Sequence, residues 1–512
     1  MAWRPVCELD ESALYGGTED YGSYEALANL TVSIAGVTEY SKYKRTLDLE
    51  TALHSADFTA NGASFSTVQF CSFPDQVCVY HVSSNKPLPQ ITFGLVDNYR
   101  TNPASTVKCS SDGVHLSGRT VADEGEGLIG MKFDAQAHVL SSSGAKTSCN
   151  INGETVVDAN RAVKSVTIVV ASGTEYDPKK GDAAHKYSFR GVDPYPGVMK
   201  TIEAVSKKSY NPVLNRHVRD HGEWFNKFTL DLPDPHDSAD VDTTDLLTNY
   251  KTEKGDPFVE NLLVDYGQYM FIASSRPGSL PPNLQGSWAP DGNPAWSSDY
   301  HIDVNVQMNH WHVEKMGLGG LTDPLWDFMT YTWVPRGTES ARLWYNASGW
   351  VAFTNLNIFG HTGQMNDATW SNVAHDVAWM MAHVWDRYDY GRDKKWYASV
   401  GYPMMKGVAS FWVDMGTEAE RTLLQSGSWT STSRTTRIAI CLACTASIPA
   451  TSSPASTQTT RPSWPPSPQA STRAATAPKA PTRAGKRRGE EPAGASWASP
   501  TRPTRSSSTP ST

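Results

Sequence analysis

Short runs in which apolar and polar residues alternate fill the first 195 residues of the chain. A period of two is typical of β-strands with one buried face, and clusters of Gly, Asn, Pro and Ser separate the runs. The pattern predicts an antiparallel β-sandwich over residues 1–195, which we expect to serve as a packing partner. The clearest expected strands are residues 43–53, 63–70, 76–82, 90–96, 130–133 and 165–170.

From residue 256 the apolar positions follow a helical period instead. Five of them line one face of the first predicted long helix: Phe258, Leu262, Tyr266, Met270 and Ala273. Further helices are expected at residues 306–317, 323–334, 370–389 and 403–415. Between the two patterns, residues 196–256 predict a helical linker with helices at 198–208 and 211–225. Long helices joined by loops with polar and aromatic residues fit an (α/α) barrel over residues 257–424, with the site at the loop end.

The composition changes abruptly at residue 425. Residues 425–512 hold nine Arg and two Lys against only Glu490 and Glu491, and they contain no Asp, Asn, His, Tyr, Phe, Val or Met. A segment rich in Ser, Thr, Pro and Ala cannot bury a core, so this basic low-complexity tail is expected to be disordered. A mucin-like stalk or basic tail is one interpretation. The abrupt onset favours the other, an out-of-frame translation.

Charge and leader signals exclude several classes of partner. The net charge of −8 and the pI near 6.0 argue against nucleic-acid binding. No apolar run is long enough to cross a membrane, and the first ten residues lack the apolar core of a signal peptide. Two cysteine pairs, Cys71/Cys78 and Cys109/Cys149, are spaced for local disulfides in a β-rich region. Free buried thiols are the equal alternative, because sequence does not give connectivity.

Candidate chemistry is concentrated in residues 283–311. Trp288, Trp296, Trp311 and Tyr300 lie among carboxamides, carboxylates and a histidine. Aromatic rings cover the C–H faces of a sugar, while amides and carboxylates meet its hydroxyls. The composition of this stretch therefore predicts an oligosaccharide-binding site.

The spacing of His301, Asp303 and Asn305 indicates the local backbone. Residues two apart point to different sides of a helix but share one face of an extended segment. We therefore expect extended backbone over residues 300–305 and a helix that starts near Val306. The alternative is that Asp303 only caps that helix, which is a common function of aspartate.

A colinear series of motifs resembles glycoside hydrolase family 95, the α-L-fucosidases, over roughly residues 15 to 420. The motifs in the helical half are N-L-Q-G-x-W at 283–288, N-P-x-W at 293–296, Y-x-I-D-V-N-x-Q-M-N-x-W at 300–311, G-W-V-A at 349–352, Asn355, A-W at 378–379 with His383, Trp385 and Tyr388, and Y-P-M-M-K-G at 402–407. Upstream, Y-G-S-Y at 21–24 and Y-x-R-x-L-D-L at 43–49 resemble the N-terminal β domain of the family. A series in order is much more specific than any one motif.

The resemblance implies a fold and a location. The expected architecture is a large two-sheet super-sandwich followed by an (α/α)6 barrel of twelve helices. Helical sequence here ends after about half of them, so residues 257–424 are expected to form a partial barrel. The family usually has further strands before the Y-G-S-Y region, so the β domain is expected to be N-terminally incomplete. The family is largely extracellular, which implies that this chain, a fungal-type member by its resemblance, is a secreted protein.

The resemblance also implies an activity and a set of residues. The reaction is inverting hydrolysis of terminal α-1,2-linked L-fucose, or L-galactose in some relatives, with no cofactor and no metal. Carried over by position, the catalytic pair is Asp303 and Asn305. The residues expected to bind the sugar are His301, Trp288, Trp296, Asn309, Trp311, Asn355 and His383. For Trp379 and His383, which lie one helical turn apart, core packing is the favoured alternative. The oligomeric state is not predicted.

Two departures from the family pattern affect the expected activity. Asp303 stands where the family has an asparagine, so this carboxylate could take a proton from water that an amide only orients. The family's general acid lies in a later S-P-E motif, and no such motif occurs after residue 305. Loss of a general acid lowers rates by ~10²–10⁴-fold. The sequence therefore predicts little or no fucosidase activity for this polypeptide. Phe353 and Asn357 also differ from the family pattern, so the choice of sugar is open.

The sequence leaves two rival functions open. A different (α/α)-barrel glycosidase or phosphorylase is the rival among enzymes, and a non-catalytic sugar-binding remnant is the rival outside them. A metal site is not expected, because His310, His312 and Glu314 would scatter around a helix. Cys441 and Cys444 resemble half a zinc knuckle, but no second pair follows.

Overall fold

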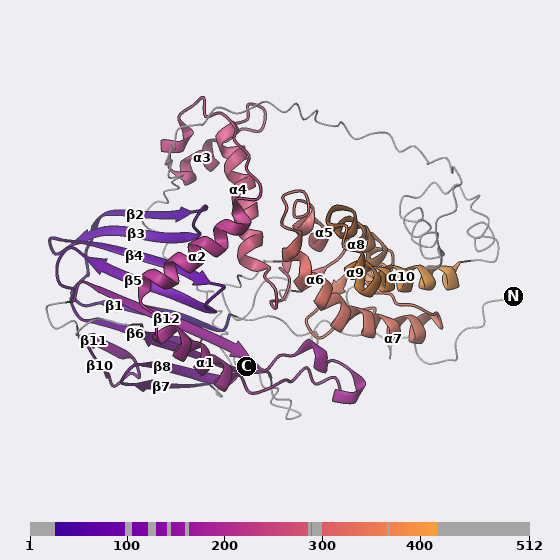
Figure 1. Ribbon diagram of the computed structural model, residues 1–512, viewed down its shortest axis with the longest axis horizontal. Helices are drawn as coiled ribbons and strands as arrows, with labels where there is room; N and C mark the ends of the chain where they lie inside the picture. The colour runs from indigo at the N-terminus through magenta and orange to yellow at the C-terminus, as the bar shows by residue number, and fades with distance from the viewer. Residues whose placement is uncertain are drawn as a thin grey trace, which may run out of the picture.

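Two β-sheets lie at one end of the protein and a group of helices at the other in the computed structural model (Figure 1). The structure describes residues 26–97, 105–120, 130–140, 145–158, 163–284, 288, 299–365 and 369–416. The predictions for residues 425–512, for Trp296 and for the Y-G-S-Y motif lie outside these residues. None of the helices in the described part is long and apolar enough to cross a membrane.

The β domain is a sandwich of two antiparallel sheets, as the alternating pattern predicts. The larger sheet has the strand order β2-β3-β4-β5-β12-β9-β8-β7, and the smaller has the order β1-β6-β11-β10. The strands are β1 (Ala28–Ile34), β2 (Ser41–Asp48), β3 (Leu53–Ala60), β4 (Ala63–Ser72), β5 (Val77–Ser84), β6 (Ile91–Asp97), β7 (Thr106–Ser110), β8 (Gly113–Arg119), β9 (Lys132–Val139), β10 (Lys146–Cys149), β11 (Thr155–Asp158) and β12 (Ser165–Thr174).

The faces of the two sheets that meet form an apolar core. Val82, Phe93, Leu116 and Ile168 are fully buried there. Because successive side chains of a strand alternate between its faces, each strand contributes every second residue to this core. The alternation read from the sequence therefore corresponds to one buried face on each strand.

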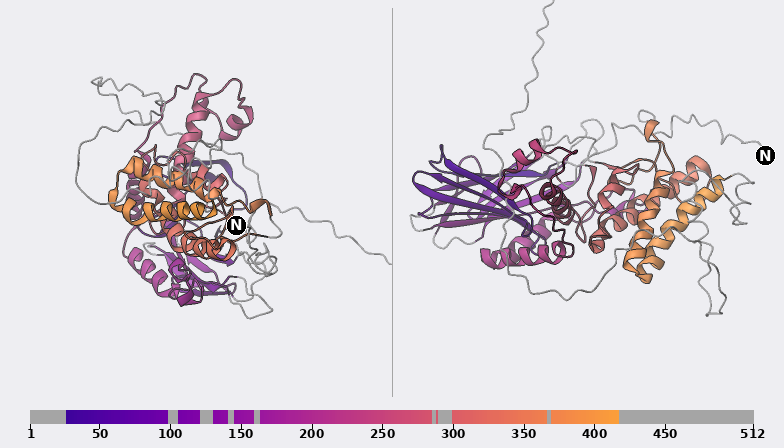
Figure 2. Two further views of the ribbon diagram at one scale, coloured as in Figure 1. Left: turned by 90° about the vertical axis from the view of Figure 1, so that its right-hand side faces the viewer. Right: turned by 90° about the horizontal axis from the view of Figure 1, so that it is seen from above.

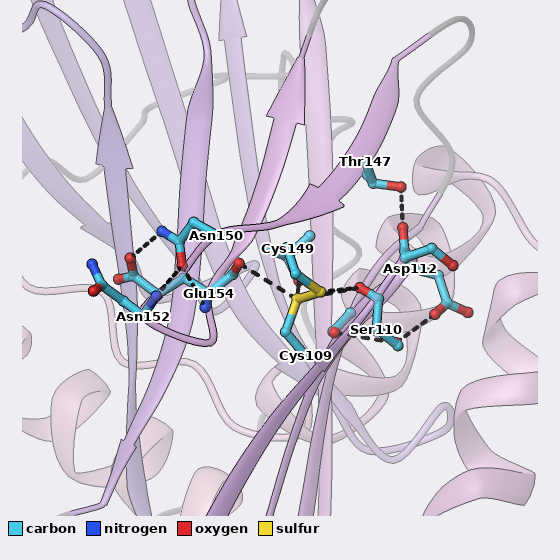
Figure 3. Close-up of a disulfide and its surroundings, with 11 residues drawn as sticks. Cys109, Ser110, Asp112, Thr147, Cys149, Asn150, Asn152 and Glu154 are labelled. Atoms are coloured by element: carbon cyan, nitrogen blue, oxygen red, sulfur yellow. Dashed lines mark hydrogen bonds between the residues drawn. A yellow bond between two sulfur atoms is a disulfide. The ribbon is translucent and has the colours of Figure 1, made fainter.

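Disulfides form at both candidate cysteine pairs. Cys71 and Cys78 lie opposite each other on β4 and β5, and a disulfide joins them. A second disulfide joins Cys109 on β7 to Cys149 on β10, so it connects the edges of the two sheets (Figure 3). The alternative of free thiols at these positions is wrong.

Two helices of the predicted linker cover the outer face of the larger sheet. Helix α1 (Pro194–Ser206) begins with Pro194 behind Asp193, whose side chain accepts a hydrogen bond from the backbone N–H of Tyr195. It buries Val198, Ile202 and Val205 against β9 and β12. Helix α2 (Tyr210–Phe225) packs on β4 and then on α4. The first half of the predicted linker is thus part of the core around the sandwich.

The helical unit follows (Figures 1 and 2). Its helices are α3 (Thr243–Asn249), α4 (Pro257–Ser274), α5 (Asn305–His310), α6 (Asp323–Phe328), α7 (Val334–Tyr345), α8 (Asp376–Gly391), α9 (Lys394–Trp396) and α10 (Tyr402–Met415), with π-helical turns at Met329–Trp333 and Tyr397–Gly401. Trp333, Trp350 and Tyr300 are the largest fully buried side chains of its core.

Two predicted helices are shorter than the sequence pattern indicates. The predicted helix 306–317 ends at His310, because Val313 and Leu318 both enter a core with Leu49 of the sandwich, and turns replace the helix there. The predicted helix 370–389 begins only at Asp376. The preceding Ser371 accepts a hydrogen bond through its carbonyl from the backbone N–H of Thr354, which draws that segment away from the helix.

Candidate active site

The candidate site is built on a short two-stranded ladder. Strand β14 (Tyr300–His301) pairs antiparallel with β15 (Asn355–Leu356), so His301 lies opposite Asn355. The N–H of Ile302 donates to the carbonyl of Thr354 at 3.0 Å, which continues the ladder by one residue. Tyr300 and Ile302 are fully buried in the helical core. His301 and Asp303, which alternate with them, therefore face away from that core.

The extended segment is shorter than predicted. Residues 302–304 form a turn, and α5 begins at Asn305, one residue before the predicted start at Val306. The turn is closed by the side-chain amide of Gln307, which donates to the carbonyl of Ile302. The prediction of extended backbone over all of residues 300–305 is therefore wrong beyond His301. The alternation between buried and outward-facing side chains holds for residues 300–303.

Asp303 is the middle residue of this turn and is exposed. Its Oδ1 accepts a hydrogen bond from the backbone N–H of Val304 at 3.0 Å. The N-cap residue of α5 is Val304, and no side chain caps that helix end. The alternative role of Asp303 as a helix cap is therefore not observed, and its carboxylate faces solvent.

Histidine 301 is held by a buried carboxylate. Its Nε2 lies 3.0 Å from Oδ1 of Asp299, and the two side chains are only 12% and 6% exposed. The ring of Trp370 stands edge-on to the imidazole at 5.8 Å, and Trp370 itself is 61% exposed. A carboxylate on one ring nitrogen fixes the orientation of the imidazole. Sequence reasoning did not assign a role to Asp299 or to Trp370.

Asn355 contributes an acceptor without a hydrogen-bond partner. Its side-chain Oδ1 is buried and receives no hydrogen bond from the described residues. A buried acceptor left in this state costs about 1–3 kcal/mol. A hydroxyl group of a ligand at this position would satisfy it.

A buried carboxyl group, Asp376, supports the ladder from behind. The hydroxyl of Thr354 donates to Oδ2 of Asp376 at 2.5 Å. The backbone carbonyl of Thr354 accepts the hydrogen bond from the N–H of Ile302. Burial raises the pKa of the Asp376 carboxyl, although the hydrogen bond from Thr354 opposes the shift. Sequence reasoning missed this residue because it placed Asp376 inside the helix 370–389 rather than at its start.

The remaining predicted residues are more widely distributed. His383 bonds through Nε2 to the carbonyl of Gln307 at 3.1 Å, so it packs α8 against α5. Asn309 is half-buried on α5, and Trp288 is 43% exposed. Of the predicted set, four residues lie on or next to the ladder: His301 and Asn355 pair across it, Asp303 lies in the turn that follows, and Asn305 begins α5.

A cavity of about 70 Å³ lies beside the later part of α5 and does not include these four residues. It is lined by His310, Trp311, Glu314, Lys315, Thr322, Trp326, His383, Asp386 and Tyr390. Burial raises the pKa of Glu314 to about 7, although Arg387 opposes the shift. Trp311 and His383 therefore border this second region rather than the ladder.

The described part of the chain contains no candidate metal site. No three His, Cys, Asp or Glu side chains are grouped there so as to hold a metal ion. The four gathered residues instead offer an imidazole, a carboxylate and two carboxamides, which are groups that hydrogen-bond hydroxyls and water.

Comparison with known proteins identifies relatives of both halves. Residues 209–451 match the glycosyl hydrolase family 95 catalytic domain, and residues 7–179 match the glycosyl hydrolase family 65 N-terminal domain. The chain is 46% identical over 403 residues to the probable alpha-fucosidase A of Aspergillus niger, covering 78% of this chain and 50% of the relative. It is 30% identical over 417 residues to alpha-L-fucosidase 2 of Arabidopsis thaliana, covering 76% of this chain and 48% of the relative.

These relatives are longer proteins, and the chain spans about half the length of each. Among solved structures, one described as a kojibiose phosphorylase from the human microbiome is similar in fold. The TM-score is 0.53 at 13% sequence identity, over 79% of this chain and 52% of that one. That similarity supports the arrangement of a β-sandwich followed by a helical domain.

Proposed function

The chain belongs to glycosyl hydrolase family 95, and we propose that it binds a terminal α-L-fucosyl group of an oligosaccharide at the β14–β15 ladder. The reaction assigned to this site is hydrolysis with inversion. The observation that carries the proposal is the cross-strand pair of His301 and Asn355, with Asp303 two residues further on. An α-L-galactosyl group is the alternative sugar.

Each gathered residue has a role in this proposal. The exposed carboxylate of Asp303 accepts a proton from the attacking water, and the amide of Asn305 holds that water. The imidazole of His301, oriented by Asp299, bonds a sugar hydroxyl. The buried Oδ1 of Asn355 accepts a second hydroxyl hydrogen. Trp370 offers an exposed aromatic ring beside them.

We expect the rate of hydrolysis to be low. Inversion needs a general acid across the glycosidic bond, about 6.5–9.5 Å from the base. Asp376 is only 4% exposed and bonded to Thr354, so we assign it no proton transfer to the leaving group. A polypeptide of these 512 residues holds no S-P-E motif after residue 305, and we propose that the turnover of this polypeptide is lower by ~10²–10⁴-fold than that of a family member in which the acid is present.

The proposal extends to the architecture and the location. The helices from α4 to α10 would form part of an (α/α)6 barrel. The two disulfides support an extracellular protein, because such bonds persist in oxidising compartments.

The test separates binding from turnover. We expect L-fucose to bind with a Kd on the order of 1 mM in calorimetry or ligand-observed NMR, and its mirror image D-fucose not to bind. His301→Ala should weaken binding of L-fucose at least tenfold. His236→Ala, at an exposed position far from His301 in the sequence, should leave binding unchanged. Asp303→Ala should leave binding nearly intact. Failure of L-fucose to bind contradicts the proposal.

Turnover is measured on 2′-fucosyllactose with the same preparation. Slow release of fucose that Asp303→Ala abolishes supports the assignment of the base. Efficient release would contradict the low rate, and release that requires inorganic phosphate would select a phosphorylase. Binding of L-fucose with no release from the parent chain would select a non-catalytic sugar-binding protein.

A further inference from the structure

We propose that residues 175–191, here named the strut, extend from the sandwich to fix the loop that carries Asn355, and that Tyr176 is the positioning residue within it. This loop, residues 354–361, includes β15 and is here named the site loop. The proposal rests on the proposed function only where it concerns sugar binding. It assigns the sandwich a part in forming the site, beyond that of a packing partner.

The base of the strut is fastened to the larger sheet. Glu175 follows β12, and its Oε1 accepts hydrogen bonds from Nη1 of Arg119 and from the backbone N–H of Lys132, each at 3.0 Å. The N–H of Gly191 donates to the carbonyl of Glu175 at 2.6 Å, which closes the two ends of the strut together. Movement of the strut is therefore tied to β8 and β9.

The side chain of Tyr176 contacts the site loop directly. Its hydroxyl donates to the carbonyl of Ile358 at 2.5 Å. Phe189, which is 3% exposed, packs edge-on against Phe359 at 5.4 Å and stacks on Tyr176 at 6.0 Å. Burial raises the pKa of the Tyr176 phenol, so the hydroxyl keeps its proton and remains a donor.

Inside the site loop, hydrogen bonds connect Ile358 to the ladder. Oδ1 of Asn357 accepts from the backbone N–H groups of Phe359 and His361, each at 3.0 Å. The ring of His361 bonds through Nδ1 to the carbonyl of Asn355 at 3.3 Å. Asn355 pairs with His301 across the ladder. The contact of Tyr176 thus lies three residues from Asn355 within one compact turn.

A second set of contacts joins the strut to the helices beside the loop. The Tyr187 hydroxyl donates to Oε1 of Glu339 at 2.6 Å, and the guanidinium of Arg336 lies 4.3 Å from the Tyr187 ring centre. Nζ of Lys179 lies 4.9 Å from the ring centre of Tyr331. These contacts reach α7 and the π-helical turn before it, not the site loop.

The backbone of the strut adopts a costly conformation. Lys186, Tyr187 and Phe189 all have a positive φ, between 52° and 54°. Residues other than glycine adopt this region at a cost and persist there only when surrounding contacts hold them. Here the result is that Tyr187 and Phe189 both contact the helical unit. Strained backbone maintained for a contact favours a functional role over incidental packing.

The test compares two tyrosines of the strut. Tyr176→Phe removes the hydroxyl that holds Ile358 and keeps the ring, and Tyr187→Phe makes the same change where the partner is Glu339. Hydrogen–deuterium exchange on the full chain follows peptides that cover residues 299–304 and 353–362. We expect about threefold to tenfold faster exchange in these peptides for Tyr176→Phe and no change there for Tyr187→Phe.

Binding supplies a readout that a purely structural role would not change. Well below the unfolding temperature, Tyr176→Phe should raise the Kd for L-fucose about threefold to tenfold, while Tyr187→Phe leaves it unaltered. If exchange in these peptides is unchanged in Tyr176→Phe, or increases equally in both variants, the proposal that the strut fixes the site loop is wrong. An unchanged Kd beside faster exchange overturns its role in sugar binding. A parent chain that does not bind L-fucose overturns the proposed function, while the exchange rates still decide whether the strut holds the loop.

Discussion

Asn355 and His301 differ in how fully their polar atoms are satisfied. The imidazole of His301 has a carboxylate at 3.0 Å, whereas buried Oδ1 of Asn355 receives no hydrogen bond from any residue that the structure describes. Among the described residues, no donor replaces the water that this acceptor loses on burial. The arrangement is understandable if a hydroxyl of the bound sugar donates to Asn355. The free protein would then hold its binding site at a cost in stability.

The cost in stability of a buried polar group can be measured at Glu314. Its folded-state pKa is about 7 against an ordinary 4.5, mainly because of burial. Between these values the unfolded chain ionises while the folded chain retains the proton, so stability falls as the pH rises from about 4.5 to 7. Glu314→Gln should remove up to about 3 kcal/mol of that fall.

The measurement is urea unfolding of parent and Glu314→Gln between pH 4.5 and pH 8. The variant should gain stability relative to the parent as the pH rises. Glu253→Gln, at an exposed turn, is the control and should follow the parent throughout. A constant difference between parent and Glu314→Gln across this range would mean that Glu314 ionises normally.

Sequence patterns could mark His301, Asp303 and Asn305 through both the alternation and the resemblance, and Asn355 through the resemblance alone. They could not identify the partners behind these residues. Thr354 bonds Asp376, which is 22 positions away, and Tyr176 bonds Ile358, which is 182 positions away. No local period records such contacts. Trp296 lies outside the described residues, so its role stays a prediction.

At the scale of elements, α2 shows how the sandwich and the helices share a core. His217 stacks on Phe70 of β4, and His221 stacks on Phe225. Nε2 of His221 lies 2.9 Å from the carbonyl of Leu49, in the turn after β2. This ring bonds the carbonyl as a neutral donor. Burial is the main cause that lowers the pKa of His221, to about 4.

Acid should therefore loosen α2. The folded-state pKa of His221 lies below the ordinary 6.5, so its contribution is complete above pH 6.5 and is lost as the pH falls towards 4. His221→Gln retains an N–H donor and does not titrate, so it should lose roughly 3 kcal/mol less stability between pH 7 and pH 4. Exchange of residues 210–225 with pH reports the change, and His236→Gln serves as the control. Equal acid sensitivity in parent and His221→Gln would exclude this histidine as the cause.

The elements predicted from periodicity agree with the structure where one face is buried. Helices α1, α2, α4 and α10, and strands β4, β5, β6 and β12, occur close to their expected positions. Strands β7 and β10 escaped prediction because they are short edge strands with mostly exposed residues, which leaves little apolar alternation. The predicted helix 306–317 extends beyond the end of α5 at His310. The residues after His310 fit a helical period, but Val313 among them packs in a separate core.

At the scale of the whole molecule, two extended sets of contacts join the described parts of the sandwich and the helical unit. The strut is one. The other is a shared core in which Leu49 of the sandwich meets Phe225 of α2, Phe271 of α4 and Val313. Because apolar contacts cross between the units, we expect them to unfold together rather than as independent domains.

Arg276 provides the sharpest test of this coupling. Its Nη2 lies 2.7 Å from both carboxylate oxygens of Asp220 on α2, and its guanidinium lies 4.2 Å from the ring centre of Phe73 in the β4–β5 hairpin. Arg276 is 9% exposed, so Arg276→Met leaves Asp220 as a largely buried, unpaired charge. We expect a loss of about 3 kcal/mol, or roughly 3–4 °C in a calorimetric melt, with one transition retained. Arg392→Met breaks an Arg–Asp pair that is 70% and 45% exposed and should change little. If Arg276→Met splits the melt into two transitions, this ion pair joins the units; if it has no effect, the apolar core joins them without it.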